Sequence, residues 1–86
     1  MKTIDDVKLM IIQRTGLQVA VSELSDDEPL FDEEGFALDS IDVFELSNGL
    51  EIEFNVPVEN YDKQLPEILS TPRKTFDFLK NGDFLG

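Results

Sequence analysis

Apolar residues recur at helical spacing in three separate stretches of the chain, and this pattern constrains the fold more than any other feature. In the first stretch, one face carries Ile4, Val7, Met10 and Ile11. Thr3 is a suitable N-cap before this face, and Gly16 is a suitable stop after it. The spacing therefore predicts a helix from Thr3 to about Thr15.

The second stretch predicts a helix that begins at Asp39, a good N-cap, and continues to about Phe54. At 100° per residue, the face expected to enter the core carries Val43, Leu46, Leu50 and Phe54. The opposite face combines apolar with acidic and polar residues: Ile41, Phe44, Glu45, Asn48, Glu51 and Ile52. A surface of this composition suggests that another molecule covers it.

Two further helices are predicted after Asn55-Val56-Pro57. A short one is expected from Val58 to Leu65, where Pro66 should interrupt it. The last has Ser70 or Thr71 as cap and Pro72 at the first position, and it ends at Asn81-Gly82. Its buried residues are expected to be Phe76 and Leu79.

Alternation typical of a strand occurs only over residues 17–21, and an isolated strand has no pairing partner. We therefore expect an all-α fold, a small antiparallel bundle of three main helices plus one short helix, with a long loop between the first two. The 86 residues correspond to a single domain over 1–86, with its core at about 3–80.

The predicted loop, residues 16–39, is acidic and is broken by Pro29 and Gly35. Apolar residues are spread along it: Val19, Val21, Leu24, Leu30, Phe31, Phe36 and Leu38. Because so long a connection is unusual in a compact domain, we expect it to be pinned across the core, with a short helical turn near Pro29.

Seven basic residues stand against 19 acidic ones, giving a net charge of −12, and the chain has no Cys and no His. This charge disfavours nucleic acids and anionic membrane surfaces as partners. The composition also removes disulfides, thiolate nucleophiles, the usual zinc sites and an imidazole base. With no signal-like or membrane-spanning apolar run, we expect a cytoplasmic protein. We also expect a monomer.

The segment Gly35-Phe36-Ala37-Leu38-Asp39-Ser40-Ile41-Asp42 places a serine directly after a helix cap. The N–H groups of a helix start favour an anion, so a phosphodiester on Ser40 would be stabilised there. As an unaided nucleophile Ser40 is poorly placed, because Asp39 and Asp42 flank it and the chain has no histidine.

These residues resemble the acyl carrier protein family, in which an Asp-Ser-Leu or Asp-Ser-Ile motif opens the second helix. The similarity extends through Glu45-Leu46 and residues 50–54, and it covers roughly Thr3 to Lys80. The resemblance implies that Ser40 receives a 4′-phosphopantetheine arm from coenzyme A and that Asp39 supports this site. It also implies a carrier rather than an enzyme, serving fatty-acid, polyketide or related acyl-chain synthesis.

The implied partners are a phosphopantetheinyl transferase and acyl-loading, ketosynthase-type and acyltransferase enzymes with basic docking surfaces. Between Arg14 and Lys63 there are 14 acidic residues and no basic one, so the negative charge surrounds Ser40. The residues expected to dock partners are Ile41, Asp42, Phe44, Glu45, Glu51 and Ile52.

Three features depart from the family pattern. Ala37 stands where a glycine is common, Ser47-Asn48-Gly49 places poor helix formers in mid-helix, and the connection from Lys63 to Thr71 is long and contains proline. Other functions stay open from the sequence: a peptidyl carrier, an unmodified acidic adaptor, and a small hydrolase using Ser40. No metal site is expected, since a calcium loop centred on Gly35 would place Leu30 and Ile41 at liganding positions.

Overall fold

The computed structural model describes residues 2–86 and contains helices and no strands in that range. The principal helices are α1 (Ile4–Thr15), α2 (Ser40–Phe54) and α4 (Pro72–Asn81), and a short α3 (Leu65–Ile68) precedes α4. Two 3₁₀ segments complete the order: η1 (Val21–Glu23) and η2 (Val58–Gln64). The all-helical prediction is confirmed, and α1, α2 and α4 lie within one residue or so of their predicted ranges.

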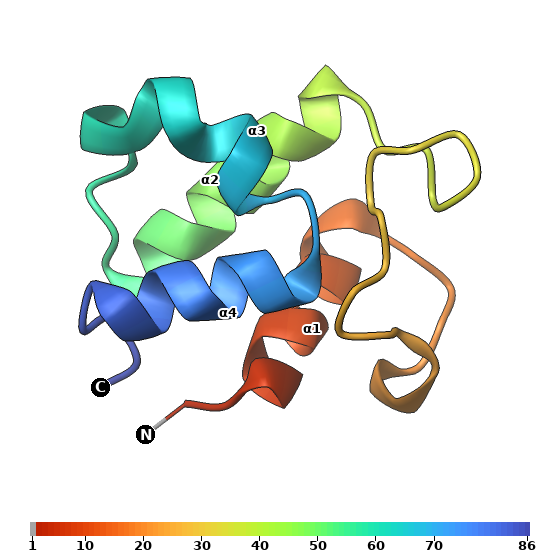
Figure 1. Ribbon diagram of the computed structural model, residues 1–86, viewed down its shortest axis with the longest axis horizontal. Helices are drawn as coiled ribbons and strands as arrows, with labels where there is room; N and C mark the ends of the chain where they lie inside the picture. Colours follow the sequence, from red (N-terminus) through yellow and green to blue (C-terminus); the bar gives the residue numbers. More distant parts are fainter. Residues whose placement is uncertain (1) are drawn as a thin grey trace.

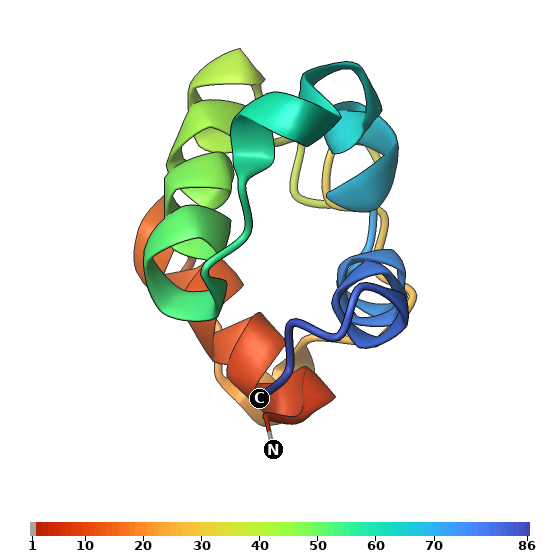
Figure 2. The same ribbon diagram turned by 90° about the vertical axis from the view of Figure 1, so that its left-hand side faces the viewer.

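The helices surround one apolar core (Figure 1). α1 packs against both α2 and α4, while α3 contacts α2, η2 and α4. Figure 2 shows α2 and α4 on opposite sides of the molecule, with α1 at one end and η2 and α3 at the other. The buried core consists of Val7, Met10, Ile11, Leu24, Leu30, Leu46, Leu50, Phe54, Val56, Leu65, Ile68, Leu69, Leu79 and Leu85.

The ends of α1 follow the local signals in the sequence. Thr3 is the N-cap residue, and the Asp6 carboxylate accepts from its N–H at 2.7 Å, which is the reciprocal half of a capping box. Gly16 takes the left-handed conformation, φ 74°, and its N–H donates to the Ile12 carbonyl. On the predicted apolar face, Val7 and Ile11 are fully buried.

Three local predictions are wrong. Pro66 does not interrupt a helix but lies in the first turn of α3, where the absent N–H would have had no helical partner. The helical turn of the long loop is η1, whereas the chain around Pro29 forms non-helical turns. Phe76 is only half-buried, and the fully buried place beside Leu79 belongs to Thr75.

Thr75 is buried without penalty because its hydroxyl is satisfied. Its Oγ1 lies 2.8 Å from the Ile68 carbonyl and 3.1 Å from the Thr71 carbonyl, and so ties α4 to the end of α3. The connection from Lys63 to Thr71 is accordingly not an open loop. It consists of the end of η2, α3 and the buried Leu69.

The C-terminal residues extend the core beyond the predicted limit of about residue 80. Leu85 is 3% exposed, and its carbonyl accepts from the Lys2 N–H at 2.8 Å. The Phe84 ring stacks on Phe78 at 5.8 Å between centroids, and Phe78 meets Tyr61 edge-on at 4.9 Å. Both ends of the described chain are therefore joined to each other and to the core.

Within residues 2–86, none of the helices combines the length and apolar character needed to cross a bilayer.

Candidate functional site

The start of α2 is held by a reciprocal cap made by two carboxylates. Asp39 has extended backbone angles, and its Oδ1 accepts from the N–H groups of Ile41 at 3.0 Å and Asp42 at 3.3 Å. In return, Asp42 Oδ2 accepts from the Asp39 N–H at 3.0 Å. This capping box fixes the backbone on both sides of Ser40 and confirms Asp39 as the helix cap.

Ser40 is the first residue of α2, and it is exposed. In the described part of the chain, no hydrogen bond engages its hydroxyl. The Oγ atom is therefore open to solvent and to an approaching molecule, at the end of a helix whose backbone is fixed.

The expected anion site at this helix start is largely used by the protein itself. The Ile41 and Asp42 N–H groups donate to Asp39, and the Val43 N–H donates to the Asp39 carbonyl at 3.1 Å. Of the first-turn N–H groups, only that of Ser40 lacks a hydrogen bond within residues 2–86. The dipole of α2 still favours negative charge at Ser40, but most of its donors are already occupied.

The predicted division of α2 into two faces is confirmed. Leu46 and Leu50 are completely buried, and Phe54 is 3% exposed. Val43 is half-buried and packs against the core. On the other side, Ile41, Phe44 and Ile52 are 69%, 62% and 65% exposed, and we call these three residues with Glu45 and Glu51 the outer face of α2.

Negative charge around the outer face is not compensated by the fold. Ion pairs within residues 2–86 use Lys8, Arg14, Arg73 and Lys74, whose partners are Asp26, Asp27, Glu53 and Glu67. No ion pair in this range involves the acids nearest Ser40 in sequence: Asp32, Glu33, Glu34, Asp39, Asp42, Glu45 and Glu51. Their charge is left to act on approaching molecules.

Packing explains two residues of the mid-helix segment Ser47-Asn48-Gly49, namely Ser47 and Gly49. Ser47 is buried, and its hydroxyl donates to the Phe44 carbonyl at 2.7 Å. A Cβ at Gly49 would lie 2.6 Å from Met10 Sδ and 3.1 Å from Arg14 Cγ. The glycine therefore permits the close approach of α1 to α2, and sequence reasoning had no signal for this contact.

The backbone leading to Ser40 is tightly turned. A Cβ at Gly35 would collide with the Pro29 carbonyl oxygen, so glycine is required at that position. Ala37 has φ 51°, in the left-handed region, and its N–H donates to the Asp32 carbonyl at 3.0 Å. An alanine therefore adopts the conformation that a glycine would take more readily.

Replacing Ala37 by glycine is expected to raise the free energy of unfolding by about 0.5 kcal/mol. Relief of the left-handed strain at alanine, about 1 kcal/mol, exceeds the entropy that glycine adds to the unfolded chain. The matched control is Ala20→Gly, at φ −84°, which should lower stability instead. Urea unfolding measures both, and a decrease for both variants would contradict the strain at Ala37.

Comparisons with known proteins give no positive result: no protein-family model matches the chain, no curated protein matches it, and no solved structure matches it. Within residues 2–86, no group of three or more potential ligands lies close enough to hold a metal ion.

Proposed function

We propose that this chain is an acyl carrier protein in which Ser40 carries a 4′-phosphopantetheine arm. The observation that supports this most strongly is the placement of Ser40: exposed, first in α2, and directly after the capped Asp39. The finer architecture belongs to the same proposal, namely an antiparallel bundle of three main helices in which the 16–39 loop leads to the modified serine.

The residues present fit this prosthetic group. The Ser40 hydroxyl is exposed and free of hydrogen bonds in the described chain, and the nearby Asp39 and Asp42 carboxylates already accept from backbone N–H groups. A phosphodiester at Oγ would lie at the positive end of the α2 dipole, with the Ser40 N–H as an available donor. When bound, the group would supply the thiol that the cysteine-free chain lacks, so that acyl chains are carried as thioesters.

In this proposal the chain's own residues hold Ser40 in position and present it to a partner enzyme. The reciprocal cap holds Ser40 at a fixed backbone position, and the outer face of α2 contacts the partner. Its acidic residues have no ion-pair partner within residues 2–86, so they would attract the basic surface of a transferase or acyl-loading enzyme. The exposed side chains of Ile41, Phe44 and Ile52 would supply apolar contact.

The test is transfer of the arm from coenzyme A by a broad-specificity phosphopantetheinyl transferase, read by intact-mass spectrometry. The wild type and Ser22→Ala, which removes another exposed serine, should each gain the mass of one 4′-phosphopantetheine group. Ser40→Ala should gain none. Absence of a gain in the wild type, or an equal gain in Ser40→Ala, would overturn the proposal.

The unmodified acidic adaptor is the second candidate, and one observation favours it: the first-turn donors of α2 are satisfied without a phosphate. An adaptor would bind its basic partner equally well as wild type and as Ser40→Ala, and it would not accept the arm. The mass measurement therefore separates the two functions. The choice between an acyl and an aminoacyl cargo follows from which loading enzyme charges the modified form.

A further inference from the structure

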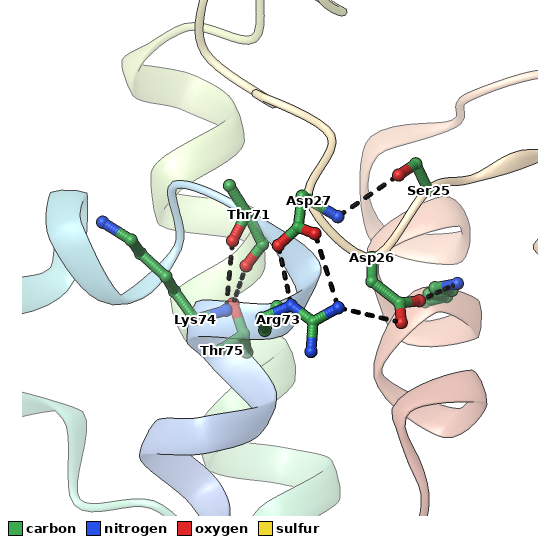
Figure 3. Close-up of polar contacts among 8 residues, drawn as sticks. Ser25, Asp26, Asp27, Thr71, Arg73, Lys74 and Thr75 are labelled. Carbon is green, nitrogen blue, oxygen red and sulfur yellow. Dashed lines mark hydrogen bonds and ion pairs between the residues drawn. The ribbon is translucent and has the colours of Figure 1, made fainter.

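The proposed function does not use the acidic run at residues 26–28. Asp26 and Asp27 lie between α1 and the start of α4, where they face two cations from different helices (Figure 3). We call Lys8, Asp26, Asp27 and Arg73 the charge latch.

Lys8 is the inner part of the latch. It is a buried cation on α1, with its side chain 10% exposed, and its ammonium lies 2.5 Å from Asp26 Oδ1. Asp26 is its only ion-pair partner within residues 2–86. Removing a buried lysine from its partner leaves an uncompensated charge, so the Lys8 position strongly favours an arrangement in which Asp26 stays in place.

Arg73 is the outer part. Its Nε donates to Asp27 Oδ1 at 2.7 Å, and its Nη2 lies 3.5 Å from Asp26 Oδ2. The hydrogen bond to Asp27 raises the pKa of Arg73, and the hydrogen bond from Lys8 is the main cause that lowers the pKa of Asp26 below its ordinary value of 3.8. The lowered pKa keeps Asp26 ionised at neutral pH, so the latch is closed there.

Backbone hydrogen bonds continue the attachment beyond the charged side chains. The Arg73 N–H donates to the Asp26 carbonyl at 2.7 Å, and the Leu30 N–H donates to the Ser70 carbonyl at 3.0 Å. The Leu38 N–H then donates to the Leu30 carbonyl at 3.0 Å. A continuous series of contacts thus connects the latch to the residue that precedes the Asp39 cap.

We propose that the charge latch fastens segment 25–38 to α1 and α4, and that the segment opens as a local unit, with the helices still folded, when the latch is released. The segment is suited to local opening because it has no regular secondary structure and its acidic residues Asp32, Glu33 and Glu34 are exposed. Leu30 is its only fully buried side chain, and Phe31, Phe36 and Leu38 pack against the core only while partly buried, so the apolar packing that opposes release is looser than that of the main helices. This inference does not depend on modification of Ser40.

Residue-resolved amide hydrogen exchange of Lys8→Met tests the latch, since methionine keeps an apolar stem but removes the charge. The reporters are the amides of Leu30 and Arg73, whose hydrogen bonds join the segment to Ser70 and to α4, and the amide of Leu38, whose hydrogen bond to Leu30 lies within the segment. The references are the amides of Leu46 and Leu50 in α2. We expect the reporters to exchange about tenfold faster and the references to change by less than about threefold.

The matched control is Lys74→Met. Lys74 also lies 2.5 Å from a carboxylate, Glu67, but that pair is exposed and lies outside the latch, so the reporters should not change. If Lys8→Met does not fold, Arg73→Gln decides the question, because the Arg73 side chain is about half exposed and its replacement leaves no buried charge without a partner. It should accelerate the same three reporters by at least about threefold and leave α2 unchanged.

Equal acceleration of reporters and references would show that the segment opens only by global unfolding. No acceleration of the reporters would show that the latch does not hold the segment. Either result would overturn the inference, whatever the outcome of the arm-transfer experiment.

Discussion

The double variant Glu45→Lys/Glu51→Lys is expected to accept the 4′-phosphopantetheine arm at least about tenfold more slowly than the wild type, measured as the apparent second-order rate at low carrier concentration. Both acids lie on the outer face of α2 and make no ion pair within residues 2–86. Under the proposed function, reversing their charges would convert attraction to a basic transferase into repulsion, and the effect should fall mainly on the rate of association.

Salt gives a second measure of the same effect. Because the Debye length is about 8 Å at physiological ionic strength, raising the salt should slow the wild type and reduce the difference between the two proteins. Asp42 is left unchanged in this experiment, since its carboxylate caps Asp39 and its replacement would disturb Ser40 as well as the charge.

The matched control is Asp62→Lys/Asp77→Lys, which changes the net charge equally at two exposed residues outside α2. It should retain most of the wild-type rate, because Asp77 lies on α4, on the opposite side of the molecule from α2 (Figure 2), and Asp62 lies in η2 and not on the outer face of α2. Equal slowing by the two double variants would mean that net charge, and not the outer face of α2, determines the rate.

Replacing Leu85 by alanine is expected to lower the free energy of unfolding by about 2–4 kcal/mol. Leu85 is 3% exposed and belongs to the core, although it lies only one residue from the end of the printed sequence. The substitution removes buried apolar contacts and weakens the attachment of the chain end beside Lys2. Urea unfolding monitored by far-ultraviolet circular dichroism provides the measurement.

Leu9→Ala is the control for this variant, because Leu9 is 44% exposed on α1 and alanine is the better helix former. Its effect should stay below about 1 kcal/mol. If Leu85→Ala is no more destabilised than Leu9→Ala, the C-terminal residues do not contribute to the core in solution.

The features that were predicted correctly depend on neighbouring residues in the chain. The N-cap residues of α1, α2 and α4 are Thr3, Asp39 and Thr71. The side chains of Asp39 and Thr71 accept from first-turn N–H groups of their own helices. Because a cap acts on the residues next to it, the starts of these helices could be placed from the sequence. The Asp39 cap and the helical spacing of apolar residues also predicted that Ser40 starts α2 and that Ile41 and Phe44 point away from the core.

The errors occurred where distant residues decide the outcome. Pro66 is compatible with either a helix end or a helix start, and the buried Leu65 and Ile68 make it part of α3. A threonine in an exposed-looking helix position is expected on the surface, and Thr75 is buried because its hydroxyl donates to the Ile68 carbonyl, seven residues earlier in the chain. At the start of α2 the Asp39 cap was predicted, but the sequence does not show that, among the described residues, only the Ser40 N–H of the first turn is left without a hydrogen bond.

The sequence by itself thus determined the helical class, the ranges of the three main helices and the exposed position of Ser40, because caps and apolar periodicity act over one or two turns of chain. Only the tertiary structure decided that Gly49 admits α1, that Leu85 belongs to the core and that Asp26 pairs with the buried Lys8. Each of these depends on which surfaces meet in space, and contacts between residues far apart in the chain leave no periodic trace in a single sequence.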